Sequence, residues 1–492
     1  MRLTLTATAI VLTIAAGASA SPMTALDDYV AAPDPTYSYS YNPANTIAGP
    51  GYTAYRLDMR SQTWRSAPSE VDRDEWQHWV TVIVPDTVDT TNSFLFVTGG
   101  SASTIPPPIP SLDGGLVSLA LESNAVTVQL RTVPNQRLTF SDETSSRVED
   151  EIIAYTFDKY MDNPTDEEWP LLLPMVKSTV RAMDTTQDFI DDITGGSLQI
   201  DDFTVSGASK RGWTTWLTAA VDDRVSAIAP LVFDALNFEE QLPNHVEQYQ
   251  DVTAFTVEGQ LGRASVAVHD YVDLDIFYRM LNTPEGQDLL QIVDPYSYLD
   301  RLDMPKYIIN SAGDEFFVPD SSQFYFGELL GENYLRYVPN SGHGLNASAL
   351  DDLIDFYNAY VDGAAFPEYT WVIDPNGKKI LVNTLTGTLL GVNLWQSTNL
   401  AAQDFRNAWT STVWTSSALS PSGLDEYMAS VARPSSGATA FFIELLYEVN
   451  GTQIAFTTDV SVVTTAPEPA SWALLAFGGV VVLGVRRRRR AA

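Results

Sequence analysis

An α/β fold with a largely parallel sheet, followed by a β-sandwich-like C-terminal module, is the architecture that the sequence predicts. Between residues 21 and 366, short apolar runs rich in Val and Ile alternate with longer stretches of helical character, which is typical of strands buried in a parallel sheet. After Pro367 the chain is richer in Thr, Val, Trp and Asn and carries frequent turn signals. We therefore expect a β-rich module over residues 367–463.

The apolar runs of the first part are the predicted strands of the sheet. They are Trp79–Val84, Ser93–Thr98, Ala125–Leu130, Phe203–Ser206, Ala227–Leu231, Tyr307–Asn310 and Leu335–Val338. A long segment from about 238 to 299 separates two of these runs. We expect this segment to form a lid-like insertion in the α/β domain.

Composition excludes several classes of function. The chain has 492 residues, of which 45% are hydrophobic, so it can bury a large core. Acidic residues outnumber basic ones by 62 to 28, and a net charge of −34 argues against binding to nucleic acid. The absence of cysteine rules out disulfides, a thiolate zinc site and a cysteine nucleophile. Asp270, Asp273 and Asp275 lack the spacing of a known cation-binding loop, so neither a metal nor a cofactor is expected.

The N-terminus carries the pattern of an export signal. Arg2 precedes an apolar run from Leu3 to Ala16, and Ala18-Ser19-Ala20 fits a small-x-small cleavage site. Residues 1–20 are therefore expected to be a signal peptide.

Residues 464–492 have the pattern of a second targeting signal. Pro467-Glu468-Pro469 leads into an apolar span over residues 470–485, a candidate transmembrane helix, and five arginines at 486–490 follow. This tail resembles the PEP-CTERM sorting tail of Gram-negative bacteria. The resemblance implies an exosortase-type processing enzyme as a partner and a transient stay in the inner membrane. Together the two termini predict a protein exported across the inner membrane to the cell envelope, surface or extracellular matrix.

Ser209 is the candidate nucleophile. It lies in a turn between the strand ending at Ser206 and a helix beginning near Trp213. A nucleophilic serine of an α/β-hydrolase sits on such a sharp turn, where small neighbours such as Gly207 and Gly212 let the backbone pack tightly. The pattern departs from G-x-S-x-G because the second glycine follows the serine by three positions. An ordinary β-turn-α connection is the alternative.

Asp314 and His343 are the candidate partners of this serine. Each follows a predicted strand, in the chain order Ser, Asp, His that α/β-hydrolases use. A histidine can take the proton of the serine, and an aspartate can orient the imidazole. Glu315 and Asp320 are rival acids, but Asp314 comes first after its strand.

The other three histidines are weaker candidates for a general base. His78 lies beside tryptophans at a strand entry and is expected to be a packed structural residue. His245 and His269 fall in the lid-like segment, where they are expected on the surface or in the lining of a pocket. His245 could contact a substrate.

The oxyanion of a tetrahedral intermediate needs two N–H donors. The backbone N–H of Lys210 is one candidate, and that of Gly99 or Gly100, just past a strand, is the second. The alternative for the two glycines is a simple turn.

The side chains of Lys210 and Arg211 are unusual neighbours for a nucleophile in so acidic a chain. Either could face an anionic substrate group or pair with a carboxylate such as Asp222 or Asp223. We expect pairing for Arg211 and leave Lys210 open.

These motifs carry a family resemblance. GASKRGWTTWLTAAVDDRVSAIAP, SAGDEFFVPDSSQFYF, YVPNSGHGL and the early Trp-Gln-His-Trp segment closely resemble the PhoPQ-activated pathogenicity-related protein family. The resemblance extends over nearly the whole chain between the terminal addresses, so the β-rich module looks like part of the family unit. It implies an α/β-hydrolase fold with a Ser-Asp-His site at Ser209, Asp314 and His343, and no particular substrate.

The function that these predictions favour is an exported serine hydrolase acting on a small ester, peptide or saccharide-linked substrate. The G-x-S-x-x-G spacing with a basic residue after the serine also resembles that of glucuronoyl esterases. A peptidase acting on short peptides is the second possibility within the enzyme class. A non-catalytic surface or matrix protein that keeps the hydrolase fold is the alternative outside it.

Overall fold

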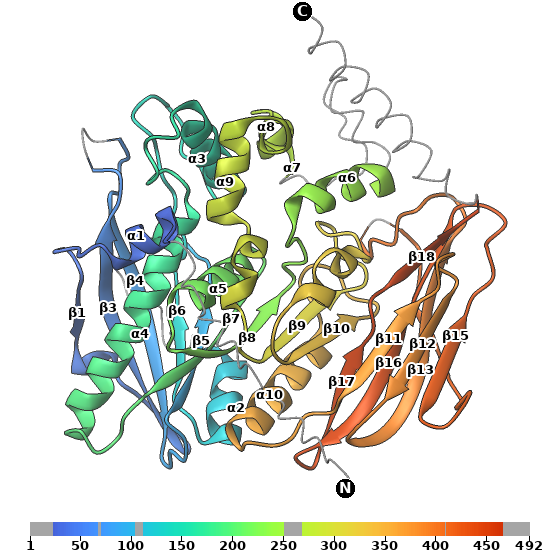
Figure 1. Ribbon diagram of the computed structural model, residues 1–492. Coiled ribbons are helices and arrows are strands. Elements are labelled where there is room, and N and C mark those ends of the chain that lie inside the picture. The colour runs from blue at the N-terminus through green and yellow to red at the C-terminus, as the bar shows by residue number, and fades with distance from the viewer. Residues whose placement is uncertain (1–22, 67–69, 104–111, 250–267, 409, 466–492) are drawn as a thin grey trace, which may run out of the picture.

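The computed structural model describes residues 23–66, 70–103, 112–249, 268–408 and 410–465 (Figure 1). The predicted signal peptide and the apolar span of the predicted sorting tail lie outside these residues. Within the described part of the chain, no helix combines the length and the apolar character that a membrane span requires.

A ten-stranded central sheet organises the first part of the described chain. Its strands are β1 (Ser38–Tyr41), β2 (Ile47–Gly49), β3 (Tyr52–Thr63), β4 (Glu75–Pro85), β5 (Asn92–Val97), β6 (Thr127–Leu130), β7 (Asp202–Ala208), β8 (Val225–Leu231), β9 (Lys306–Ser311) and β10 (Asn333–Val338). They lie in the order β1-β3-β4-β6-β5-β7-β8-β9-β10, and β2 pairs with β3. From β6 to β10 all neighbours are parallel, whereas β1 to β4 are antiparallel.

The predicted α/β class with a largely parallel sheet is confirmed, and each of the seven predicted strands corresponds to an observed one. The antiparallel start of the sheet was not predicted. β1 to β3 contain Tyr, Thr and charged residues in place of a continuous apolar run, because much of their surface is only partly buried.

Helices cover both faces of the sheet. The strand β9 shows why: Ile308 packs into one apolar cluster, whereas Tyr307 and Ile309 pack into another, since successive side chains of a strand point to opposite faces. The first cluster is completed by α1 (Ala25–Ala31), α3 (Asp150–Asp162), α4 (Leu172–Thr194), α5 (Lys210–Val221) and α9 (Pro284–Val293). The second is completed by α2 (Gly114–Ser123) and α10 (Ala347–Val361).

The segment between β8 and β9 is helical where the structure describes it. It contains α6 (Phe238–Tyr249), α7 (Val268–Val272), α8 (Ile276–Asn282) and α9, which lie at the top of the view in Figure 1. These helices extend above the carboxyl ends of the parallel strands, the position in which a substrate-selecting element of this fold would lie. The predicted lid-like insertion over 238–299 stays a prediction as regards its role.

Two antiparallel sheets form the C-terminal part, as predicted for residues 367–463. One contains β11 (Tyr369–Ile373), β12 (Lys379–Thr384) and β15 (Glu426–Ser430), and the other β13 (Thr388–Asn399), β14 (Thr415–Ala418), β16 (Ala438–Val449), β17 (Thr452–Thr457) and β18 (Ser461–Thr464). Ile380 of the first sheet and Phe441 of the second belong to the same buried cluster as Tyr307 of the central sheet. The β-module therefore shares a core with the α/β domain.

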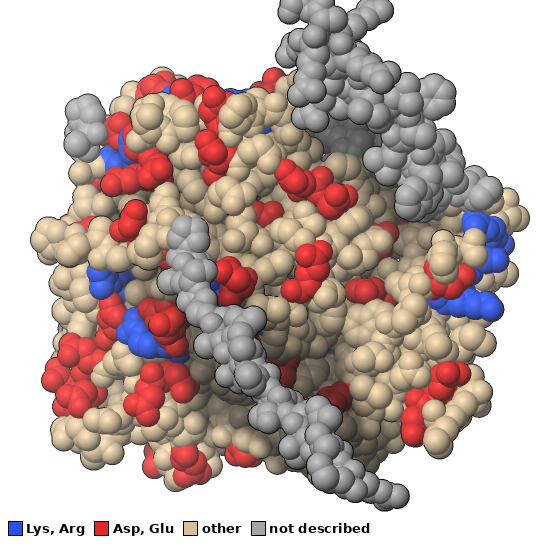
Figure 2. All heavy atoms as spheres, viewed as in Figure 1, with Lys and Arg blue, Asp and Glu red and all other residues tan. Residues whose placement is uncertain are grey.

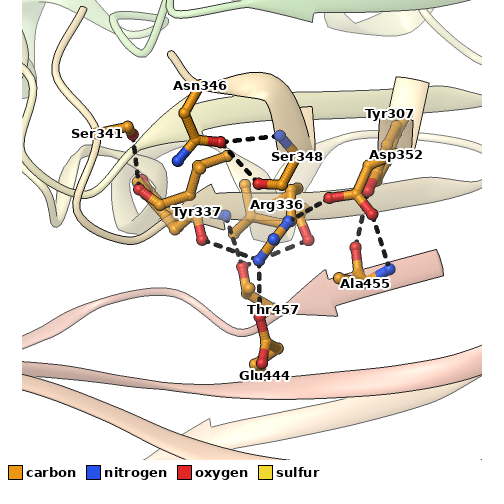
Figure 3. A network of polar contacts seen from close by, with 12 residues as sticks. Tyr307, Arg336, Tyr337, Ser341, Asn346, Ser348, Asp352, Glu444, Ala455 and Thr457 are labelled. Atoms are coloured by element: carbon orange, nitrogen blue, oxygen red, sulfur yellow. Dashed lines mark hydrogen bonds and ion pairs between the residues drawn. The ribbon is translucent and has the colours of Figure 1, made fainter. Parts of the chain in front are cut away.

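Polar contacts join the two parts at the edge strand β10 (Figure 3). The buried guanidinium of Arg336 bonds to Asp352 of α10 at 2.8 Å and to Glu444 of β16 at 2.9 Å. The hydroxyl of Thr457 in β17 accepts the N–H of Tyr337 at 3.0 Å and donates to the carbonyl of Leu335 at 3.4 Å. A threonine side chain thus satisfies backbone groups that a further strand would otherwise pair.

Acidic residues are spread over the face of the molecule shown in Figure 2 and are far more numerous there than basic ones. This distribution agrees with the net charge of the chain. On this face the acidic side chains are dispersed and do not gather in one patch.

Candidate active site

Ser209 occupies a strained turn between β7 and α5. Its backbone has φ 60° and ψ −126°, which a residue with a side chain rarely adopts. The turn is held because the N–H of Ser209 donates to the carbonyl of Leu231 at 2.8 Å and its carbonyl accepts the N–H of Trp213 at 2.9 Å. This is the geometry that lifts a serine hydroxyl above the edge of a sheet.

The two glycines near Ser209 are required by close backbone contacts. A Cβ at Gly207 would lie 2.7 Å from the carbonyl oxygen of Arg211, and one at Gly212 would lie 2.9 Å from that of Leu231. The second glycine is therefore displaced by one position because it serves the packing of α5 against β8. Arg211 occupies the position between Lys210 and Gly212, and its side chain bonds to Glu149 and to the carbonyl of Val133.

Asp314 and His343 are brought together by the loops after β9 and β10. His343 Nδ1 lies 2.9 Å from Oδ2 and 3.0 Å from Oδ1 of Asp314. The carboxylate is almost completely buried, while the imidazole keeps a side-chain exposure of 20%. The N–H of Phe316 donates to Asp314 at 2.7 Å, and the Phe316 ring packs on the imidazole with 4.2 Å between centroids. A carboxylate held in this way fixes the tautomer with the proton on Nδ1 and leaves Nε2 as the base.

The two rival acids have other partners. Glu315 accepts the backbone N–H of His343 at 2.7 Å, so it supports the loop of the histidine. Asp320 is buried and accepts hydrogen bonds from the side chains of Asn244 and Gln248.

Ser209, Asp314 and His343 follow the carboxyl ends of β7, β9 and β10, which are parallel and separated by only one strand, β8. All three residues therefore lie at one edge of the sheet. The hydroxyl of Ser209 makes no hydrogen bond with any residue that the structure describes. Catalytic hydrogen bonds are often long in a free enzyme and shorten when substrate binds.

The N–H groups of Lys210, Gly99 and Gly100 donate no hydrogen bond within the described ranges of the chain. Lys210 is the first residue of α5, where backbone N–H groups lack partners inside the helix. Gly99 follows β5, and a Cβ there would lie 2.5 Å from Nη2 of Arg211, so a side chain at this position would displace the guanidinium. Gly100 has φ 128°, which favours glycine.

The side chains of Lys210 and Arg211 both pair with carboxylates at the start of α3. Arg211 forms two hydrogen bonds of 2.8 Å with Glu149 and one of 2.6 Å with the carbonyl of Val133. Lys210 Nζ lies 2.8 Å from Asp150 and 3.2 Å from Glu149. Burial would raise the pKa of Glu149, but the hydrogen bonds and charges of Arg211 and Lys210 outweigh it and lower that pKa to about 2.

Pairing was expected for Arg211, but the partners named from the sequence were wrong. Asp222 instead bonds to Arg224 at 2.7 Å. No local sequence signal marks Glu149 as the true partner, because Glu149 lies 62 positions before Arg211 and the pairing depends on the tertiary fold.

A buried carboxyl that was not predicted follows β8, the strand between those that precede Ser209 and Asp314. Asp234 follows β8 and accepts hydrogen bonds from the hydroxyls of Tyr325 at 2.7 Å and Tyr337 at 2.6 Å. Burial raises its pKa to about 7, against the effect of the two tyrosine hydrogen bonds, and the nearby Asp314 raises it further. No sequence pattern marks this residue.

The remaining histidines are placed as follows. His78 is fully buried between the Arg131 carbonyl and the Ser61 hydroxyl, each 3.0 Å away, and burial lowers its pKa to about 4. His245 contacts the carbonyls of Gln241 and Phe316 and holds α6 against the loop after β9. His269 lies in α7 and is partly buried. Within the described ranges no cluster of three or more His, Asp or Glu residues is arranged to hold a metal ion.

The sheet order, the strained elbow and the position of the Asp314–His343 pair define the class of this protein as an α/β-hydrolase fold. Among solved structures, the chain is similar to acetyl xylan esterase 1 from Thermoanaerobacterium sp. JW/SL YS485, with 13% sequence identity and a TM-score of 0.43. The match covers 68% of this chain and 90% of the esterase chain. It is also similar to an acetyl xylan esterase from Paenibacillus sp. R4, with 10% sequence identity and a TM-score of 0.44. This match covers 66% of this chain and 89% of the esterase chain.

The chain belongs to the PhoPQ-activated pathogenicity-related protein family, whose model matches residues 26–406. It is also 35% identical over 467 residues to the autocrine proliferation repressor protein A of Dictyostelium discoideum, covering 89% of this chain and 90% of that protein. The family named from the motifs is thereby confirmed.

Proposed function

We propose that this protein is an exported serine hydrolase that cleaves an ester or amide bond through Ser209, His343 and Asp314. The observation that carries the proposal is the pairing of His343 Nδ1 with a buried Asp314, at the sheet edge where Ser209 sits in a strained elbow. Each of these features costs free energy, since the fold must hold a strained backbone and a buried carboxylate. Their occurrence together supports catalysis over a purely structural role.

In the proposed mechanism, Nε2 of His343 takes the proton of the Ser209 hydroxyl as the oxygen attacks the substrate carbonyl. Asp314 stabilises the imidazolium that forms. The N–H of Lys210 and that of Gly99 or Gly100 would bind the oxyanion. His343 then gives its proton to the leaving alcohol or amine, and water hydrolyses the acyl-enzyme through the same groups in reverse.

The test is covalent labelling by a fluorophosphonate probe, which phosphonylates an activated serine with loss of fluoride. We expect labelling of the wild type and none of Ser209→Ala. Ser197→Ala removes the hydroxyl of an exposed serine after α4 and should be labelled like the wild type. Absence of labelling in folded wild-type protein would contradict the proposal.

The proposal also includes the class of substrate, which a panel of model substrates can determine. A panel of p-nitrophenyl esters, aminoacyl amides and glucuronate esters separates a carboxylesterase, a peptidase and a glucuronoyl esterase. The pairing of Lys210 with Asp150 and Glu149 leaves its charge compensated and weakens the case for an anionic substrate group. We therefore expect turnover of uncharged esters to exceed that of glucuronate esters.

A non-catalytic role is the second candidate. The name of the Dictyostelium relative describes an autocrine repressor of proliferation, which is a regulatory activity. A surface or matrix protein on this fold would show no labelling and no turnover in the panel, while Ser209→Ala would keep its biological effect.

Export and processing belong to the same proposal. The pattern of residues 1–20 supports passage across the inner membrane of a Gram-negative-type bacterium, and the tail over 464–492 supports cleavage by an exosortase-type enzyme. Mass spectrometry of the protein from the cell envelope should show a new N-terminus at Ser21 and loss of the arginines at 486–490. An intact C-terminus on the envelope protein would contradict the processing step.

A further inference from the structure

One connection of the β-module reaches the loops of the candidate acid and base. It joins β13 to β14 and is described over residues 400–408 and 410–414. The backbone N–H of Asn407 donates to the carbonyl of Gly313 at 2.9 Å. The side chain of Asn340 donates to the backbone carbonyl of Trp414 at 2.9 Å and accepts the backbone N–H of Trp414 at 2.8 Å. The same connection therefore binds both loops.

These contacts lie directly beside the functional side chains. Gly313 immediately precedes Asp314, and Asn340 stands three positions before His343. Asn340 has φ 53°, a left-handed conformation that asparagine adopts more readily than most residues, and its two hydrogen bonds to Trp414 add a tertiary restraint to this turn.

The loop after β9, the loop after β10 and the β13–β14 connection pack closely against one another at Gly313. A Cβ at this position would lie 2.8 Å from the carbonyl oxygen of Ser341 and 3.0 Å from Cβ of Asn407. The loops of the acid and the base are also tied to each other, since Ser311 Oγ donates to the Ser341 carbonyl at 2.7 Å and Ser341 Oγ donates to Ser311 Oγ at 2.9 Å. A displacement of one loop must therefore move the others.

The connection itself is anchored in the β-module. Within the connection, Arg406 and Asp404 form a buried ion pair of 2.7 Å, and the side chain of Asn399, the last residue of β13, donates to the carbonyl of Asp404 at 2.7 Å. The ring of Trp414 is buried against Phe442 of β16, with 5.2 Å between centroids. Anchors of this kind give the connection the rigidity that a supporting element of a catalytic site needs.

We propose that the β13–β14 connection positions the Asp314–His343 pair, so that the β-module is a working part of the hydrolytic site and Asn340 and Asn407 are positioning residues. The inference rests on the proposed function. It also gives the module a role other than adhesion, because its contacts converge on the two loops that carry the acid and the base.

The test compares two asparagines in left-handed turns. Asn340→Gly keeps the backbone conformation, because glycine adopts positive φ freely, and removes both hydrogen bonds to Trp414. Asn450→Gly is the matched control: Asn450 has the same φ of 53°, bonds through its side chain to Asp362, and lies in the exposed turn between β16 and β17. Both variants are made in the full chain.

We expect the rate of fluorophosphonate labelling to fall about 10- to 100-fold in Asn340→Gly and to stay at the wild-type value in Asn450→Gly. The midpoint of the pH profile of labelling should move to lower pH in Asn340→Gly only, because a loosened carboxylate stabilises the imidazolium less. Both variants should unfold within a few degrees of the wild type. A purely structural role of Asn340 would change the unfolding temperature and leave the pH profile where it is.

A wild-type rate and pH midpoint in Asn340→Gly would overturn the inference. If that variant fails to fold, Asn340→Asp carries the same test, since it keeps the acceptor for the Trp414 N–H and loses only the donor; a wild-type rate and midpoint there would also overturn it. Failure of the proposed function is distinguishable, because the wild type itself would then remain unlabelled. In that case the low-field proton resonance of His343 Nδ1–H, compared in the wild type and Asn340→Gly, decides whether the connection positions the pair.

Discussion

The candidate nucleophile and the candidate acid–base pair lie at the same edge of the sheet, but they are not supported by the same parts of the chain. Ser209 is held within the α/β domain by the close packing of β7, α5 and β8 and by the charged contacts of Lys210 and Arg211 with the start of α3. The loops of Asp314 and His343 are tied to each other within that domain and are also bonded to a second part of the chain, the β13–β14 connection of the C-terminal module. One half of the site therefore depends on local sterics and charge alone, whereas the other half also contacts the C-terminal sheets.

The largest expected effect comes from the acid. Asp314→Asn keeps the shape but offers an N–H where His343 needs an acceptor, so the imidazole takes the wrong tautomer. We expect the labelling rate of Ser209 to fall by about 10³- to 10⁴-fold, with little change in unfolding temperature. Glu315→Gln, which alters only the acceptor of the His343 backbone N–H, should cost about 10-fold or less. Equal losses in the two variants would show that Glu315, and not Asp314 alone, acts on the imidazole.

On the nucleophile side, Arg211→Met should act mainly on stability. It removes two hydrogen bonds to Glu149 and leaves that carboxylate with Lys210 and Gln136 only. We expect a loss of about 3 kcal/mol in the free energy of unfolding, measured in urea. The variant should also slow labelling, because Gly99 would lose the guanidinium that packs against it.

The matched control for this substitution is Arg224→Met. Arg224 pairs with Asp222 and Asp184 at the far end of α5 and is more exposed, so its loss should cost only about 1 kcal/mol and leave labelling unchanged. A double variant, Arg211→Met with Glu149→Gln, should regain part of the stability, because the carboxylate that lost its guanidinium partner is then replaced by a neutral amide. Strict additivity of the two single changes would contradict the pairing.

Asp234 lies between the two halves and predicts a pH effect of intermediate size. Burial raises the pKa of this carboxyl to about 7 in the folded protein, whereas in the unfolded chain it titrates near 4. Below pH 4 it is protonated in both states. As the pH rises from about 4 to 7 the unfolded chain releases the proton first, so the folded protein loses stability, by an amount of order 2–4 kcal/mol.

Asp234→Asn should remove this slope from the free energy of unfolding measured between pH 5 and 8. The amide can still accept from one tyrosine and donate to the other, so the packing is retained. An unchanged slope in the variant would assign the pH dependence to other groups.

The smallest effect tests the junction between the two parts. Thr457→Val leaves the N–H of Tyr337 without an acceptor and should lower the free energy of unfolding by about 1–2 kcal/mol. The rate of fluorophosphonate labelling should not change, because the loop that contains His343 still follows β10. Thr452→Val, which removes an exposed hydroxyl at the first position of β17, is the control and should cost less than about 0.5 kcal/mol.

Features marked by local sequence were predicted from it. The buried parallel strands are short Val- and Ile-rich runs, and Ser209, Asp314 and His343 each follow such a run within a glycine-containing turn. The pairing of Asp314 with His343 followed from the rule that the carboxyl ends of parallel strands meet at one edge. The rule needs only the order of the strands.

Features that arise from tertiary contacts were not predicted. Glu149 gives no local sign of its pairing with Arg211, and the contact of Asn340 with Trp414 spans 74 positions. The partial burial of β1 to β3 likewise depends on what packs against them, so their mixed composition gave no clear period. The sequence could therefore place the reactive side chains, but not the residues that support them.

The threonine at the edge of the central sheet has a consequence for biosynthesis. Thr457 lies 120 positions after Tyr337, whose N–H it accepts. While the chain grows from its N-terminus, β10 is complete long before the residue that covers it has been made, and its edge is open to pairing with another chain. The edge of the central sheet is therefore covered only when β17, a strand of the C-terminal module, has been made, so this part of the fold is completed late in synthesis.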